Sequence, residues 1–153
     1  MRVDRASRLV MAPRERVFDA FTKREAAIRW LPPAGAHAIL DEFDPTPGGL
    51  FRMTLVFGES DITKRKTSEN SDTVDGKFVE IVCPARIVQE FTFVSDDPKF
   101  AGRMLMTWTL AETSKGTLVS VAAENVPKGI SPEDHRIGMA SSLENLARYV
   151  EDR

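Results

Sequence analysis

The chain has 153 residues, of which 42% are hydrophobic and 29% charged, with a formal net charge of −2 and one cysteine. This length suits a single domain with one core, and the composition is that of a globular rather than a disordered protein. The near-neutral charge gives no general attraction to phosphate backbones, so we expect no nucleic-acid partner.

No stretch approaches the roughly 18 consecutive apolar residues of a membrane span. The first residues, Met1 to Arg5, also lack the apolar run of a signal peptide. One cysteine excludes an internal disulfide and suits a reducing compartment. We therefore expect a cytoplasmic protein without a membrane span.

The first part of the chain predicts one strand followed by two short helices. Residues 3–11 have the β-branched and apolar content of a strand. Pro13 ends this strand and opens a helix, because proline is tolerated in the first helical turn. Thr22 and Glu25 have the spacing of a capping box, so a second helix is predicted from there to about Trp30.

Residues 36–125 predict an antiparallel meander, because apolar and polar residues alternate with period two between short turn-forming segments. The longest break, from Gly58 to Thr73, contains the basic run Lys64–Lys66. Acidic residues, including Asp72, surround that run, so we interpret the break as a solvated loop. The predicted strands cover residues 37–44, 50–57, 74–83, 86–94, 103–111 and 117–125.

Residues 131–149 predict a long amphipathic helix. Ser131 is a suitable N-cap, and Pro132 suits the first helical position. With about 100° between successive residues, one apolar stripe results. It is formed by Met139, Leu143, Leu146 and Val150. We expect the upstream strands to form a curved sheet that covers this stripe and leaves a space between sheet and helix.

Alternation within the predicted strands identifies the side chains that face this helix. They are rich in methionine and aromatic residues, which can either fill a core or line a deformable apolar pocket. Composition alone leaves both interpretations open. The predicted ligand-binding residues are Phe51, Met53, Phe78, Phe91, Phe93, Met104, Met106, Trp108, Arg136, Met139, Leu143 and Leu146.

Two polar residues lie close to the stripe of the last helix. His135 and Arg136 precede Met139 by four and three positions, so both project near the apolar face. At a pocket mouth, Arg136 could bind a carboxylate or phosphate of an otherwise apolar ligand. The alternative, which we favour, is that both side chains extend into solvent around the end of the sheet.

The sequence offers little support for catalysis, metals or nucleotides. Cys83 lies in a β-type run, which favours a packing role over a nucleophilic one. Two distant histidines and one cysteine do not have metal-ligand spacing, and the usual glycine-rich phosphate motifs are missing. We expect no metal, no cofactor and no catalytic residue. An enzyme would need an inward acid or base among Glu80, Glu124 and His135.

Segments spread over nearly the whole chain are typical of one known family. They are Ala12–Phe21, Arg29–Pro32, Pro47–Arg52, Gly76–Ile81, Pro84–Val88, Met106–Leu110 and Gly116–Val121. With its order of strand, two helices, meander and long helix, the chain resembles the START-like (SRPBCC) helix-grip superfamily. Within it, the chain most resembles the activator of Hsp90 ATPase homologue 1-like (AHSA1-like) family. It departs from the family at Gly138-Met139, where members often have Gly-Trp.

The resemblance implies an α+β, Bet v 1-like fold in a single domain over residues 1–153. Its parts would be a curved antiparallel sheet of about seven strands, two short helices after the first strand, and a long C-terminal helix on the concave face.

Members of the superfamily bind lipids, hormones and polyketides, catalyse cyclisation, or act as chaperone partners. Our leading hypothesis is non-enzymatic binding of a small hydrophobic or amphipathic ligand in a cavity between sheet and helix. The alternatives are a polyketide cyclase or dehydratase-like enzyme and a chaperone-associated protein-interaction domain. The sequence leaves both a protein partner and a homodimer open.

Overall fold

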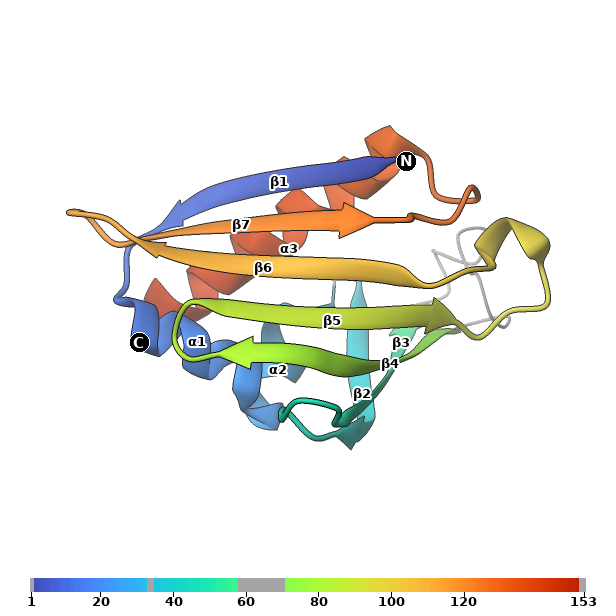
Figure 1. Ribbon diagram of the computed structural model, residues 1–153, viewed down its shortest axis with the longest axis horizontal. Helices are drawn as coiled ribbons and strands as arrows, with labels where there is room; N and C mark the ends of the chain where they lie inside the picture. The colour runs from blue at the N-terminus through green and yellow to red at the C-terminus, as the bar shows by residue number, and fades with distance from the viewer. Residues whose placement is uncertain (1, 33–34, 58–70, 152–153) are drawn as a thin grey trace.

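Seven antiparallel strands form one sheet in the order β1-β7-β6-β5-β4-β3-β2 (Figure 1). The computed structural model describes residues 2–32, 35–57 and 71–151. Consecutive strands pair from β2 to β7, and β1 pairs with β7, so β1 and β2 lie at the two edges. The strands are β1 (Val3–Val10), β2 (Ala36–Phe43), β3 (Leu50–Phe57), β4 (Ser71–Val82), β5 (Arg86–Phe93), β6 (Met104–Glu112) and β7 (Thr117–Glu124).

The α-helices lie on one face of this sheet (Figure 1). The helices α1 (Arg14–Thr22) and α2 (Arg24–Trp30) connect β1 to β2, and α3 (Pro132–Glu151) follows β7. A short 3-10 helix, η2 (Pro98–Phe100), lies between β5 and β6. The helix α3 contacts β1, α1 and α2. This is the curved antiparallel sheet with a long C-terminal helix that the sequence predicts, so the predicted fold class is confirmed.

The helix α3 begins as predicted. Ser131 Oγ accepts a hydrogen bond from the Asp134 backbone N–H at 3.0 Å, which satisfies one of the free donors of the first turn. Pro132 is the first helical residue. The predicted apolar stripe is buried against the sheet and the other helices, because Met139, Leu143, Leu146 and Val150 are at most 4% exposed.

The predicted capping box at the start of α2 is wrong. Lys23 is the N-cap, and its side chain makes no capping hydrogen bond. Thr22 is instead the last residue of α1, and its Oγ1 donates to the Phe18 carbonyl at 3.3 Å. The threonine hydroxyl therefore binds a carbonyl of the preceding helix rather than an N–H of the next one.

Three further expectations are corrected in β4 and the turn that follows it. The strand begins at Ser71 rather than near residue 74, and Asp72 is only 3% exposed rather than solvated. Pairing with β3 extends the strand to this point, because Asp72 lies opposite Leu55 in the register. Cys83 is exposed rather than packed, since β4 ends at Val82. The loop predicted over residues 58–70 lies outside the described residues.

Edge-to-face aromatic contacts join the helices to the sheet. The Phe21 ring lies 4.8 Å from that of Trp30 and 5.0 Å from that of Trp108, measured between centroids. Trp30 Nε1 donates to the Ala20 carbonyl at 2.8 Å, which satisfies its buried polar atom. These contacts pack α1 and α2 against β6.

Candidate functional site

The concave face of the sheet, which faces the helices, gathers most of the predicted ligand-binding residues. Strand register places them on this face, and the stripe of α3 meets them from the other side. They form one continuous apolar cluster rather than separate patches. Its buried members are Phe51, Phe78, Phe91, Met104, Trp108, Met139, Leu143 and Leu146.

The remaining predicted residues are less enclosed. Met53 and Met106 are partly buried and pack against the cluster. Phe93 is also half-buried, with its ring 5.9 Å from that of Phe100. Arg136 is exposed on α3 and lies off the buried stripe. Its role at a pocket mouth stays a prediction. The expectation that His135 also extends into solvent is wrong, because its side chain is 13% exposed and bound to Asp4.

Solvent reaches part of this concave face. Met53 lies opposite Val74, and Val74 opposite Phe93, across three adjacent strands. These three side chains and Met106 are half-buried although they occupy inward positions. We call these four side chains the open region. The inward residues Phe78, Ile87, Trp108 and Leu110 are instead at most 3% exposed. The concave face is therefore tightly packed around these four residues and partly exposed to solvent at the open region.

A polar side chain, Gln89, lies within this apolar face. Its register partners are Phe78 and Met106, and it is 7% exposed. Gln89 Oε1 accepts a hydrogen bond from Trp108 Nε1 at 3.0 Å. An indole nitrogen only donates, so this bond fixes which end of the amide faces Trp108. Sequence patterns did not single out Gln89, although the alternation that selected Phe91 also points Gln89 inward.

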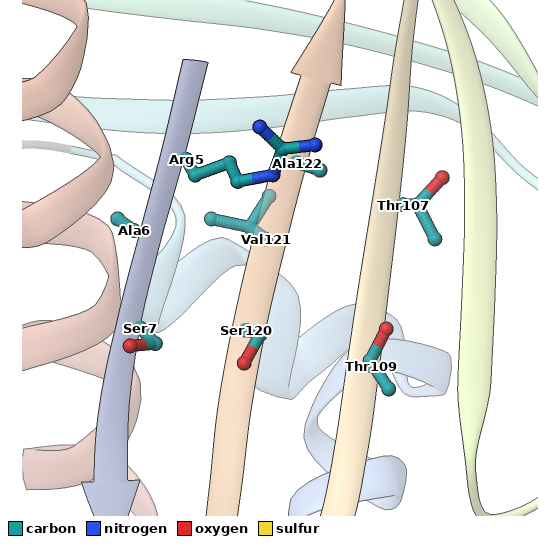
Figure 2. A pocket seen from close by; sticks show the side chains of 8 residues that line it. All are labelled: Arg5, Ala6, Ser7, Thr107, Thr109, Ser120, Val121 and Ala122. Carbon is teal, nitrogen blue, oxygen red and sulfur yellow. The ribbon is translucent and has the colours of Figure 1, made fainter. Parts of the chain in front are cut away.

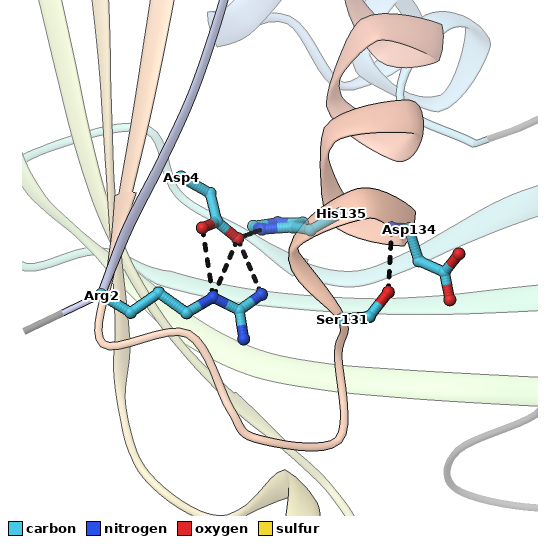
Figure 3. A network of polar contacts seen from close by, with 5 residues as sticks. All are labelled: Arg2, Asp4, Ser131, Asp134 and His135. Carbon is cyan, nitrogen blue, oxygen red and sulfur yellow. Dashed lines mark hydrogen bonds and ion pairs between the residues drawn. The ribbon is translucent and has the colours of Figure 1, made fainter.

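Asp4 is a second inward polar residue, and it joins β1 to the first turn of α3 (Figure 3). Arg2 Nη2 lies 2.8 Å from Asp4 Oδ2, and His135 Nδ1 lies 2.8 Å from the same oxygen. The side chains of Asp4 and His135 are 9% and 13% exposed. The hydrogen bond from Arg2 lowers the pKa of Asp4 below its ordinary value; burial opposes this shift, and the His135 hydrogen bond reinforces it.

We expect Asp4→Asn to lower the free energy of unfolding by about 1–2 kcal/mol at pH 7, because it weakens charge-assisted hydrogen bonds. The pKa of Asp4 is lower in the folded than in the unfolded chain. Its carboxylate therefore stabilises the fold above about pH 4, and this contribution is lost as the pH falls through the folded pKa. Urea unfolding from pH 7 down to pH 3 should show the difference between the two chains closing.

The control for Asp4→Asn is Glu144→Gln, which removes the exposed ion pair of Glu144 with Arg148 at 2.7 Å. This variant should cost less than about 0.5 kcal/mol at any pH in that range. A difference between wild type and Asp4→Asn that stays constant or widens in acid would contradict the assigned role of the Asp4 carboxylate.

The acid and base candidates do not converge on the concave face. Glu80 lies opposite Val88 in the register, and its side chain is 46% exposed and ion-paired with Arg86 at 2.6 Å. Glu124 lies opposite Val3 and so alternates with the inward Ala123. Of the three candidates only His135 faces inward, where it is bound to Asp4. Among the described residues, no group of three or more His, Cys, Asp or Glu side chains could hold a metal ion.

The opposite face of the sheet carries an open hollow of about 470 Å³ over β1, β7 and β6 (Figure 2). Hydroxyl groups and one guanidinium, all at outward register positions, give it a polar surface suited to hydrogen-bond acceptors and anions. Sequence patterns did not identify it, although small hydroxyl residues recur at these positions. The lining residues are Arg5, Ala6, Ser7, Thr107, Thr109, Ser120, Val121 and Ala122.

None of the helices in the described part of the chain is both long and apolar enough to cross a membrane.

Comparison with known proteins identifies relatives of the whole chain. Residues 11–151 match the family model described as activator of Hsp90 ATPase homolog 1-like protein. A crystal structure of a Chromobacterium violaceum protein is 34% identical with a TM-score of 0.86, and the match covers 97% of this chain and 96% of that one. No curated protein sequence matches the chain.

More distant solved structures share the fold. A Silicibacter pomeroyi protein titled AHSA1 is 18% identical with a TM-score of 0.80, and the match covers 98% of both chains. An AHSA1-like protein from Aeromonas hydrophila is 18% identical with a TM-score of 0.76, and the match covers 99% of this chain and 93% of that one. The family resemblance predicted from sequence is confirmed by the family model and the Chromobacterium relative.

Proposed function

Since the chain belongs to the family of activator of Hsp90 ATPase homolog 1-like proteins, we propose that it binds a small apolar or amphipathic molecule between its sheet and α3. The observation that carries this proposal is the open region. Met53, Val74, Phe93 and Met106 face the helices, yet solvent reaches all four of them. Inward apolar side chains on central strands are normally sealed, so their partial exposure supports a space that a ligand fills.

The chemistry of the lining supports an adaptable binding site. Methionine side chains change rotamer easily and offer a polarisable sulfur, and two of the open-region residues, Met53 and Met106, are methionines. The apolar majority of the lining favours hydrophobic ligands, while Asp4 on β1 and His135 in the first turn of α3 provide polar groups. Binding without catalysis fits the outward positions of Glu80 and Glu124.

Mass spectrometry under native conditions, applied to freshly purified protein, tests whether a small molecule is retained. Fluorescence titration with Nile red, a neutral apolar dye, then measures binding directly. We expect Met106→Trp to weaken dye binding about tenfold or more, because the larger indole occupies space in the open region. A tenfold increase in the dissociation constant corresponds to a loss of about 1.4 kcal/mol of binding free energy.

The matched control is Leu50→Trp, which adds comparable bulk at a position that is 56% exposed. It should leave the dissociation constant of Nile red within about twofold of wild type. The proposal is wrong if the purified protein retains no small molecule and wild type does not bind the dye. An equal effect of both substitutions would place the binding site elsewhere.

Protein interaction is the second candidate function, and two observations favour it. The family model carries the name of an activator of the Hsp90 ATPase. The polar hollow around Arg5 and Ser120 also presents unburied hydrogen-bonding groups to solvent. Failure of both ligand assays, together with a faster ATPase rate of purified Hsp90 in the presence of this chain, would favour protein interaction over ligand binding.

A further inference from the structure

The amide of Gln89 has hydrogen-bonding capacity that the described protein leaves unused. Its Oε1 is occupied by Trp108 Nε1 at 3.0 Å. Its NH₂ group, which can donate two hydrogen bonds, bonds to no acceptor among the described residues. Gln89 is 7% exposed as a residue, and solvent reaches its NH₂ group, since among the described residues the fully buried side-chain nitrogen or oxygen without a hydrogen-bond partner is Arg14 Nε. A donor that solvent reaches within an otherwise apolar face is available to an acceptor on a ligand.

The position of Gln89 suggests what would accept these hydrogen bonds. Its register partner on β6 is Met106, a residue of the open region, and its neighbour on the inward face is Phe91. Trp108, which holds the amide in place, packs against Phe21 and is 3% exposed. The amide is therefore held rigidly on its Trp108 side, and it lies beside the solvent-accessible part of the apolar face.

We propose that the NH₂ group of Gln89 is the polar anchor of the binding site, and that the ligand is a neutral apolar molecule with a carbonyl oxygen. This inference rests on the proposed function. A carbonyl oxygen has two lone pairs and needs only a donor, which the amide provides. Because Gln89 is uncharged, it matches a ketone or ester oxygen rather than requiring a carboxylate. Binding would pair this donor and orient the ligand.

Two ligands of nearly equal shape isolate this hydrogen bond. Butyrophenone carries a carbonyl where butylbenzene carries a methylene group, and both can be titrated as competitors of Nile red. The measured quantity is the ratio of the two dissociation constants, because this ratio cancels effects common to both ligands. We expect Gln89→Met to shift the ratio against the ketone by about two- to tenfold relative to wild type, the range for one net hydrogen bond.

The variant Gln89→Met also removes the partner of Trp108 Nε1, so a matched background is needed. In Trp108→Phe that donor is already missing, and adding Gln89→Met to it should shift the ratio by the same factor. A measurement on wild type needs no substitution: the side-chain NH₂ signal of Gln89 in a ¹⁵N–¹H spectrum should move with butyrophenone more than with butylbenzene.

The outcomes separate this inference from the proposed function. If wild type binds neither competitor nor Nile red, the proposed function is wrong and the inference falls with it. If wild type binds both competitors but Gln89→Met leaves their ratio unchanged and the NH₂ signal responds equally to both, the function stands. Gln89 then serves only to accept the hydrogen bond from Trp108, and the inference is overturned.

Discussion

Leu146→Ala is expected to lower the free energy of unfolding by about 2–5 kcal/mol, because it removes buried methyl groups and leaves a cavity. Leu146 is 0% exposed in the stripe of α3 that packs against the rest of the core. The surrounding side chains come from several elements, so they cannot all move to fill the space. Urea unfolding followed by circular dichroism gives the measurement.

The matched control lies on the same helix. Ile137 is 54% exposed, so Ile137→Ala should change the free energy of unfolding by less than about 0.5 kcal/mol. Equal losses for the two variants would mean that α3 is not held by its predicted stripe. A small loss for Leu146→Ala alone would show that the core beneath α3 can collapse around the missing side chain.

Gly76→Ala is expected to destabilise the protein by about 1–3 kcal/mol or more, the range for forced overpacking of a core. Gly76 lies between Phe51 and Phe91 in the register, and the rings of these two residues approach to 5.2 Å between centroids. An added Cβ would overlap the Glu90 carbonyl oxygen and lie 2.8 Å from Phe91 Cδ1. The strand backbone itself would have to move.

Gly138→Ala is the control for Gly76→Ala, and the opposite sign is expected. Gly138 is an exposed residue within α3, and an added Cβ there meets no atom within 4 Å. Alanine should therefore raise the free energy of unfolding by about 0.5–1 kcal/mol through its higher helix propensity. Thermal unfolding of both variants provides the comparison. A Gly76→Ala protein as stable as wild type would show that the β4–β5 pairing can separate at no cost.

Local sequence patterns were sufficient for most of the secondary structure. The strands predicted over residues 50–57 and 117–125 are observed as Leu50–Phe57 and Thr117–Glu124. Ser131 and Pro132 marked the start of α3, because capping depends on residues that are close together in the chain. The one-sided burial of Leu143 and Leu146 followed from helical periodicity alone.

The errors occurred where a residue's environment depends on distant partners. Thr22 matched a capping pattern, but its hydroxyl bonds within the preceding helix. Asp72 belonged to a polar segment, yet pairing with β3 places it in a strand and buries it. Cys83 followed a β-type run, but the turn after β4 exposes it. In each case the sequence pattern was compatible with two environments.

By itself, the sequence determined which apolar side chains share one face of each strand and helix and so form a common core. The periods of strand and helix follow from backbone geometry, so the pattern of residue types is sufficient for this. Only the tertiary structure decided which polar side chains would share that core. Gln89 meets Trp108, and Asp4 meets His135, because strand register and the docking of α3 bring together groups that are far apart in the chain. Hydrogen bonds require distances near 3 Å, which a pattern of residue types does not specify.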